Sequence, residues 1–143
     1  MDQRKTAPFR EQHDRILMIV DKISSCLTSR SELLDNASSV NKYLIELSRE
    51  LKMHLTLEDT SLYPILYRSG NDKIKKTTKE YIDEMGTIKE IFLEYISQWP
   101  SSFSIKENPE KFIKETELLF TTLGNRIERE DSGLYTMIDN MFL

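Results

Sequence analysis

A histidine and a glutamate stand four residues apart in the segment LKMHLTLEDTSLYPIL, which runs from Leu51 to Leu66. On an α-helix, side chains four positions apart leave the same face one turn apart, so the imidazole of His54 and the carboxylate of Glu58 can share one metal ion. This spacing alone is compatible with a metal site. A second copy of the segment elsewhere in the chain supports that interpretation.

The second copy lies 72 residues further along. The segment LGNRIEREDSGLYTMI, from Leu123 to Ile138, repeats the leucine, the Glu-Asp pair and the Leu-Tyr pair in register. The same offset aligns FREQHDRILMIVDKI, which begins at Phe9, with YIDEMGTIKEIFLEY, which begins at Tyr81. The chain is therefore interpreted as two copies of a two-helix unit. Such a unit buries its apolar face only by packing against the other copy.

The two copies differ at the positions that could bind a metal. At three aligned positions the first copy has two histidines and a glutamate, whereas the second has a methionine, an arginine and a glutamate. The aligned pairs are His13 with Met85, His54 with Arg126, and Glu58 with Glu130. All six positions fall on predicted core stripes. Because burying an ionised group without a partner is costly, the carboxylates need either a metal ion or the guanidinium as a partner.

Apolar residues recur with four-three spacing along four segments, which predicts four helices. The first helix is expected to start at Thr6 and Pro8, because proline is tolerated in an initial helical turn. A polar patch, Thr28 to Ser31 and later Asn36 to Ser39, is interpreted as a connection to the second helix. Ser69-Gly70-Asn71 supplies stop and restart signals before the third helix.

Pro100 and the SSFS segment are expected to end the third helix, and Asn108 before Pro109 predicts a capping residue followed by a helix-starting proline. Four helices with mostly short links predict an all-α protein, an antiparallel up-down four-helix bundle with an internal two-helix duplication. At 143 residues the chain fits one domain, covering residues 1–143, that can bury a core without a metal or disulfide.

In both copies, the four-three spacing of core positions is expected to continue beyond the glutamate. Ser61 and Ile65 in the first copy, and Gly133 and Met137 in the second, should then continue the core stripe. Pro64 removes one backbone N–H and is expected to bend the last turns of the second helix.

With these motifs the chain resembles the hemerythrin-like domains, the HHE cation-binding family. The family pattern is a His on the first helix, H-x-x-x-E with a Leu-Tyr-Pro-like end on the second, a His on the third and H-x-x-x-E on the fourth. The matching residues, spread over essentially the whole chain, are His13, His54, Glu58-Asp59, Leu62-Tyr63-Pro64, Glu130-Asp131 and Leu134-Tyr135. The resemblance implies two irons bridged by two carboxylates, and a role in oxygen binding, oxygen or nitric-oxide sensing, iron handling or stress responses.

The chain departs from the family pattern at Met85 and Arg126, which replace the two histidines of the second iron. The resemblance then implies that one half-site survives, a set suited to Fe(II), Zn(II) or Mn(II). Its metal ligands are His13, His54, Glu58 and Glu130. We expect one iron ion rather than two, with zinc or manganese as alternatives, and with the Arg126 guanidinium reaching into the vacated position to bond both carboxylates.

Two functions stay open. The first is a hemerythrin-like, mononuclear metal-binding protein that serves in sensing of oxygen, nitric oxide or iron, in metal handling or in a stress response. The second is a metal-free bundle in which Arg126 and the two glutamates form a buried ion network and the surface binds another protein. Whether Glu84, beside Met85, supplies a substitute ligand also stays open.

The bulk composition disfavours several classes of function. The net charge is −4 and no stripe of Lys and Arg stands out, which argues against nucleic acid as a partner. No nucleophilic triad or phosphate loop is evident, so binding is favoured over catalysis. No apolar run approaches about 18 residues, so we expect a cytoplasmic protein without a membrane span or signal peptide. The single cysteine, Cys26, is interpreted as a packed thiol, and the oligomeric state stays open.

Overall fold

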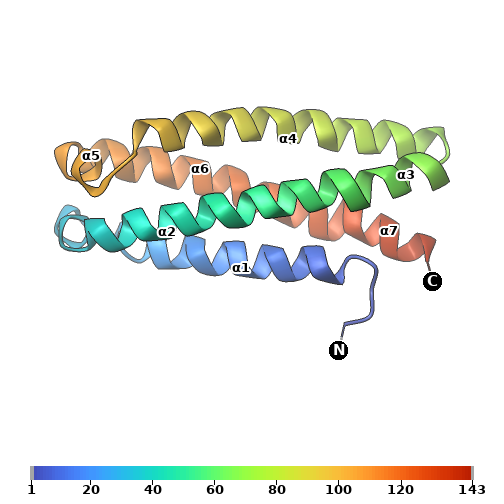
Figure 1. Cartoon of the computed structure of the whole chain (residues 1–143), viewed down its shortest axis with the longest axis horizontal. Coiled ribbons are helices and arrows are strands. Elements are labelled where there is room, and N and C mark those ends of the chain that lie inside the picture. Colours follow the sequence, from blue (N-terminus) through green and yellow to red (C-terminus); the bar gives the residue numbers. More distant parts are fainter. Residues whose placement is uncertain (1, 143) are drawn as a thin grey trace.

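A computed structural model describes residues 2–142, and every regular element in that range is a helix. The elements are α1 (Ala7–Ser24), α2 (Arg30–Leu57), η1 (Glu58–Leu62), α3 (Tyr63–Ser69), α4 (Asp72–Gln98), α5 (Ser102–Glu107), α6 (Pro109–Arg129), η2 (Glu130–Leu134) and α7 (Tyr135–Met141). They form four rods that alternate in direction along the chain: α1, α2 with α3, α4, and α6 with α7 (Figure 1). This is the predicted all-α, up-down four-helix bundle.

The second helix begins earlier than the sequence predicted. Asn36 to Ser39, interpreted as part of a connection, lie inside α2. The side chain of Ser29 accepts a hydrogen bond from the Glu32 N–H (3.1 Å) and so caps the helix at this earlier point. Leu33 and Ala37 are fully buried and carry the apolar stripe of α2 back to that start.

The link between the third and fourth rods also differs from the prediction. The third helix ends before Pro100, as expected, but the serines that follow form α5, which a reciprocal capping box between Ser101 and Ser104 begins. Pro109 starts α6 as predicted. Asn108 stands at the capping position, but its side chain makes no capping hydrogen bond. The preceding helix, α5, ends beside it, and the backbone N–H of Asn108 donates to the carbonyl of Ile105 (3.3 Å).

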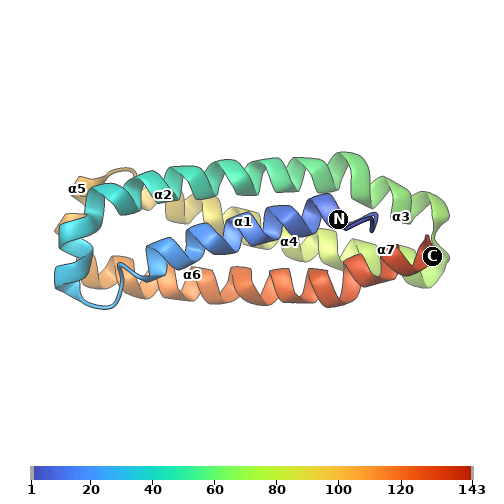
Figure 2. The same ribbon diagram turned by 90° about the horizontal axis from the view of Figure 1, so that it is seen from below.

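Two π-helical turns, η1 and η2, begin at the two repeat glutamates, and they lie 72 residues apart, as the repeat does. In each turn, the N–H of a tyrosine donates to the carbonyl of the glutamate five residues before it: Tyr63 to Glu58, and Tyr135 to Glu130. Such single π turns insert one residue into an α-helical rod. Figure 2 shows the second rod changing direction where α2 passes into α3, at this turn and Pro64.

The inserted residue shifts the buried face of both rods. Leu62 and Leu134 are buried, whereas Ser61 and Gly133 are exposed. The prediction that Ser61 and Gly133 continue the core stripe is therefore wrong. Four-three spacing assumes an unbroken α-helix, and that assumption fails one turn after each glutamate.

The core consists of two apolar clusters on either side of a polar layer. The larger cluster includes Ile16, Leu47, Phe112 and the buried Cys26. The smaller one lies toward the termini and contains Phe9, Leu62, Tyr63, Leu66, Leu134, Tyr135 and Ile138. Between the two clusters, the buried ionisable residues are His13, His54, Glu58, Arg126 and Glu130. Within residues 2–142, no helix combines the length and the apolar character needed to cross a membrane.

Gly133 in η2 leaves room for the Tyr81 hydroxyl, which donates to the Arg129 carbonyl (3.0 Å). A Cβ at position 133 would lie 2.6 Å from that hydroxyl, whereas a Cβ at Gly124 would meet no atom within 4 Å. We expect Gly133→Ala to lower the free energy of unfolding by about 1 kcal/mol through loss of this hydrogen bond. Gly124→Ala, inside α6, should raise it by about 0.5–1 kcal/mol.

Urea unfolding followed by circular dichroism measures both glycine variants. The cost of Gly133→Ala should largely disappear in a Tyr81→Phe background, where no hydroxyl competes for the space. An unchanged cost in that background would contradict this account of η2.

Candidate metal centre

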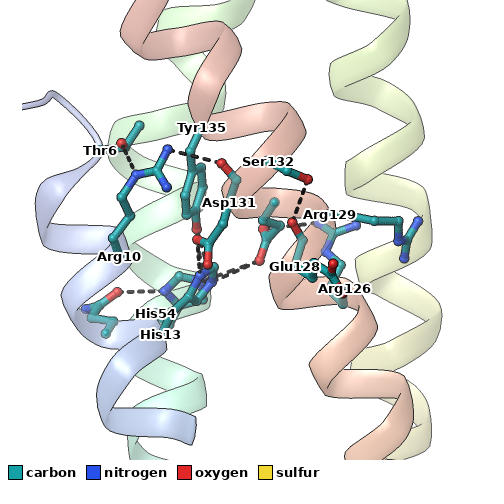
Figure 3. Close-up of polar contacts among 12 residues, drawn as sticks. Thr6, Arg10, His13, His54, Arg126, Glu128, Arg129, Asp131, Ser132 and Tyr135 are labelled. Atoms are coloured by element: carbon teal, nitrogen blue, oxygen red, sulfur yellow. Dashed lines mark hydrogen bonds and ion pairs between the residues drawn. The ribbon is translucent and has the colours of Figure 1, made fainter.

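His13 of α1 and His54 of α2 meet in the polar layer (Figure 3). Both side chains are buried, and their Nε2 atoms lie 3.0 Å apart. Each histidine sits on the inward stripe of its helix, so the antiparallel packing of α1 on α2 brings the two rings together. The distance is short for two ring nitrogens and requires either a proton or a cation between them.

The outer ring nitrogens show which tautomer each ring adopts when it is neutral. His13 Nδ1 is 2.8 Å from Asp131 Oδ1, and His54 Nδ1 is 2.7 Å from the amide oxygen of Gln12. Because both oxygens accept hydrogen bonds, each Nδ1 carries the proton, and in a neutral ring each Nε2 then presents a lone pair. Two lone pairs that face one another, with both outer N–H groups held, form the arrangement that metal-binding histidines adopt.

Two glutamates complete the group. Glu130 Oε1 lies 3.1 Å from His13 Nε2 and 3.8 Å from His54 Nε2, and Glu58 Oε2 lies 3.5 Å from His54 Nε2. The ligand atoms of His13, His54 and Glu130 all fall within 4.8 Å of one another, which fits a single metal ion. The structure thus brings the four sequence-predicted ligands together, with three of them converging most closely.

Burial and mutual contact push the pKa values of the two carboxyl groups apart. Burial raises the pKa of Glu58 well above its usual range, and the neighbouring Glu130 raises it further. Burial also acts to raise the pKa of Glu130, but the hydrogen bonds with His13 and His54 outweigh it and hold that pKa well below its usual range. The side chain of Glu130 is therefore ionised, and a cation beside Glu58 would favour the ionised form of that group as well.

The pKa values of the two histidines are also shifted in opposite directions. Burial lowers the pKa of His54, which keeps this imidazole neutral. Burial likewise acts to lower the pKa of His13, but the hydrogen bonds to Asp131 and Glu130 outweigh it, and the pKa is raised. The proton that His13 most readily accepts occupies the same space, at Nε2, that a metal ion would occupy.

Tyr135 is a site residue whose position the sequence did not predict. Its hydroxyl donates to Glu58 Oε2 (2.9 Å) and lies 3.3 Å from His13 Nε2 and 3.2 Å from His54 Nε2. The π turn explains this position, because a residue five places after Glu130 returns to the same face only in π geometry. The equivalent tyrosine of the first copy, Tyr63, has a buried hydroxyl with no hydrogen-bond partner among the described residues.

Arg126 occupies the second half of the polar layer and is almost fully buried. Its Nη2 donates to Glu130 Oε2 (3.4 Å), its Nη1 donates to Glu84 Oε1 (3.1 Å), and its Cζ lies 4.8 Å from the ring centre of Tyr81. We expected this guanidinium to bond both site glutamates. Of the two site glutamates, it forms a hydrogen bond with Glu130 but none with Glu58, because Glu84 of α4 accepts from the other terminal nitrogen.

Glu84 serves as a partner of arginines. Its carboxylate accepts hydrogen bonds from Arg129 as well as from Arg126, and the Arg129 contact is the main cause of its lowered pKa. Met85 beside it is half-buried and packs against the larger apolar cluster. The half of the layer that departs from the family pattern therefore contains an ion-pair network in place of two histidines.

Comparison with known proteins agrees with this geometry. Residues 5–138 match the model of the hemerythrin HHE cation binding domain, and the chain belongs to this family. No curated protein and no solved structure gave a match to the chain. Family and geometry together make this polar layer a candidate cation-binding centre in a helical bundle.

The hydrogen bond from His13 to Asp131 is expected to be needed for tight metal binding. Asp131→Ala should lower the affinity for Zn(II) or Fe(II) about 10- to 100-fold, because the His13 ring loses the acceptor that orients it. Asp59→Ala is a matched control, since Asp59 holds the equivalent position in the first copy and is exposed. Competition titration with a chelator measures both variants, and equal affinities would contradict an orienting role for Asp131.

Proposed function

We propose that the protein binds one metal ion and uses it in sensing of oxygen, nitric oxide or iron, in metal handling or in a stress response. The proposed ligands are His13, His54, Glu58 and Glu130. The observation that carries the proposal is the pair of Nε2 atoms 3.0 Å apart, both facing inward, with both outer nitrogens held by acceptors. Two imidazoles and two carboxylates suit iron best within this family and also accept zinc or manganese.

The buried groups around the proposed ligands fit a cation. Glu58 Oε1 is buried with no hydrogen-bond partner among the described residues, so this oxygen has a free lone pair inside the layer. A bound ion would supply a Lewis-acidic centre to which a small ligand such as oxygen or nitric oxide can bind. The protein itself orients the two rings through Gln12 and Asp131, holds Glu58 through the Tyr135 hydroxyl, and holds Glu130 through Arg126.

The second position of the layer supports one ion rather than two. The permanent charge of Arg126 lies against Glu130 and opposes a second cation nearby. Met85 offers a thioether, which is a poor ligand for the hard or borderline ions that carboxylates select. We therefore do not propose any reaction that needs two adjacent irons.

Metal stoichiometry tests the proposal directly. We expect elemental analysis to give one metal per chain after anaerobic loading with Fe(II), and none for His54→Ala, which removes one of the two facing lone pairs. The double variant Met85→His/Arg126→His should gain a second ion, because it restores both missing histidines and removes the competing charge. Two irons bound by the unaltered chain would overturn the proposal.

A second function is favoured by the ion-pair network itself. Arg126 forms ion pairs with Glu130 in the core and with Glu84, and Glu84 is also paired with the exposed Arg129. These ion pairs form a continuous network from the core to the surface. This network balances one site carboxylate without any metal. In that alternative the protein is a metal-free bundle whose surface binds another protein.

The metal-free alternative predicts a large structural role for Arg126. With chelator present, Arg126→Ala should lower the free energy of unfolding by about 3–5 kcal/mol, because it leaves the buried charge of Glu130 uncompensated. Arg129→Ala is the matched control: it removes an exposed partner of the same Glu84 and should cost about 0–1 kcal/mol. Denaturant titration of both variants, with equal and small losses, would count against the alternative.

A further inference from the structure

A cleft with a volume of about 400 Å³ opens between α2 and α4, and α6 contributes to its lining. We call it the α2/α4 cleft. The apolar residues that carry the argument are Leu51, Leu55, Ile88, Phe92, Leu93 and Leu123. A concave, largely apolar site of this size is in the range that small-molecule ligands occupy.

The cleft is elongated along the helices. Its lining runs from Ser48 on α2 to Asp59 at the start of η1, and from Met85 to Ile96 on α4. At a rise of about 1.5 Å per residue, each wall is about 16 Å long. An extended hydrocarbon chain matches this long, narrow and apolar shape better than a compact ring system does.

Two lysines give the cleft a cationic position. Lys52 of α2 and Lys89 of α4 line opposite walls, and neither forms an ion pair within residues 2–142. Because α2 and α4 run antiparallel and each lysine is equally many residues from the link between α3 and α4, the two residues lie at about the same level of the cleft. Asp59, at one end, is the single acidic residue of the lining, so the lining carries a net positive charge.

The cleft also borders the half of the polar layer that lacks histidines. Met85, which stands where the family has a histidine, is part of its lining, and Leu123 precedes the buried Arg126 by one helical turn. A thioether at position 85 extends the apolar wall, whereas an imidazole would place a polar group there. None of the four proposed metal ligands lines the cleft, so the inference below does not rest on the proposed function.

We propose that the α2/α4 cleft binds an anionic amphiphile of the medium-chain fatty acid class. The hydrocarbon chain lies along the apolar walls, and the carboxylate lies between Lys52 and Lys89. The apolar contacts supply most of the affinity, and the two ammonium groups select the anion over a neutral or cationic amphiphile of the same length.

Isothermal titration of decanoate into the full chain tests the proposal, with and without bound metal. We expect one saturable site per chain in both states, with weaker binding of decanol and weaker still of decylamine. The double variant Lys52→Glu/Lys89→Glu should bind decanoate at least about tenfold more weakly and decylamine more tightly, because the charge of the rim is reversed. Lys106→Glu/Lys111→Glu, two exposed lysines outside the cleft, is the matched control and should leave decanoate affinity unchanged.

Leu93→Asp tests whether the ligand lies along the apolar wall of the cleft. Leu93 is 57% exposed, so the substitution should not impair folding, yet it places a carboxylate in the lining and should also weaken decanoate binding about tenfold or more. Absence of saturable decanoate binding would overturn the proposal, as would equal losses in the two double-lysine variants. Self-association of the chain that Leu93→Asp abolishes, without decanoate binding, would assign the cleft to a second copy instead.

Discussion

The placement of two carboxylates inside a helical core is the constraint on which the rest of this structure depends. Glu58 and Glu130 are both almost fully buried, and a buried carboxylate without partners is too costly for a domain of this size. Residues of α1, α2, α6 and α7 therefore act as partners of the two carboxylates. For Glu130 these are the two histidines and the guanidinium of Arg126, and for Glu58 they are the Tyr135 hydroxyl and His54. The two π turns, which begin at the glutamates, bring the tyrosines back to the same face.

The two copies share their backbone geometry around the polar layer but differ in the side chains that they place there. Both copies keep the glutamate, the π turn and the tyrosine at matching positions, so the backbone geometry of the layer is common to both. The side chains differ: one half offers two imidazole lone pairs, and the other offers a cation and a thioether. Arg126 stands at the position where the family has a metal-binding histidine, and its positive charge compensates Glu130. Three buried polar atoms of the layer lack hydrogen-bond partners among the described residues: the Arg126 Nε, the Tyr63 hydroxyl and Glu58 Oε1.

The sequence predicted the helices, the duplication and the convergence of His13, His54, Glu58 and Glu130, because these follow from apolar spacing and from the 72-residue offset. It did not predict the residues that hold the ligands. Gln12 and His13 are adjacent and so point about 100° apart on the helix, which directs Gln12 toward α2 and the ring of His54. Tyr135 reaches the site only because a π turn inserts one residue, and no residue type at that position requires a π turn. The start of α2 was placed too late because Asn, Ser and Asp near a helix start can face solvent while Leu33 and Ala37 carry the buried stripe.

The separation of the core into two apolar clusters explains how the polar layer can vary without loss of the fold. The clusters lie on both sides of the layer along α1, along the rod of α2 and α3, and along the rod of α6 and α7, so apolar contacts hold the helices together above and below the site. Metal ligands can then be exchanged for an ion-pair network in one half while the other half keeps its ligand geometry. Met85 illustrates the result, because the same side chain packs on the larger cluster and lines the α2/α4 cleft. A position where the family has a histidine is part of an apolar surface here, and the proposed metal ligands lie in the half that His13 and His54 define.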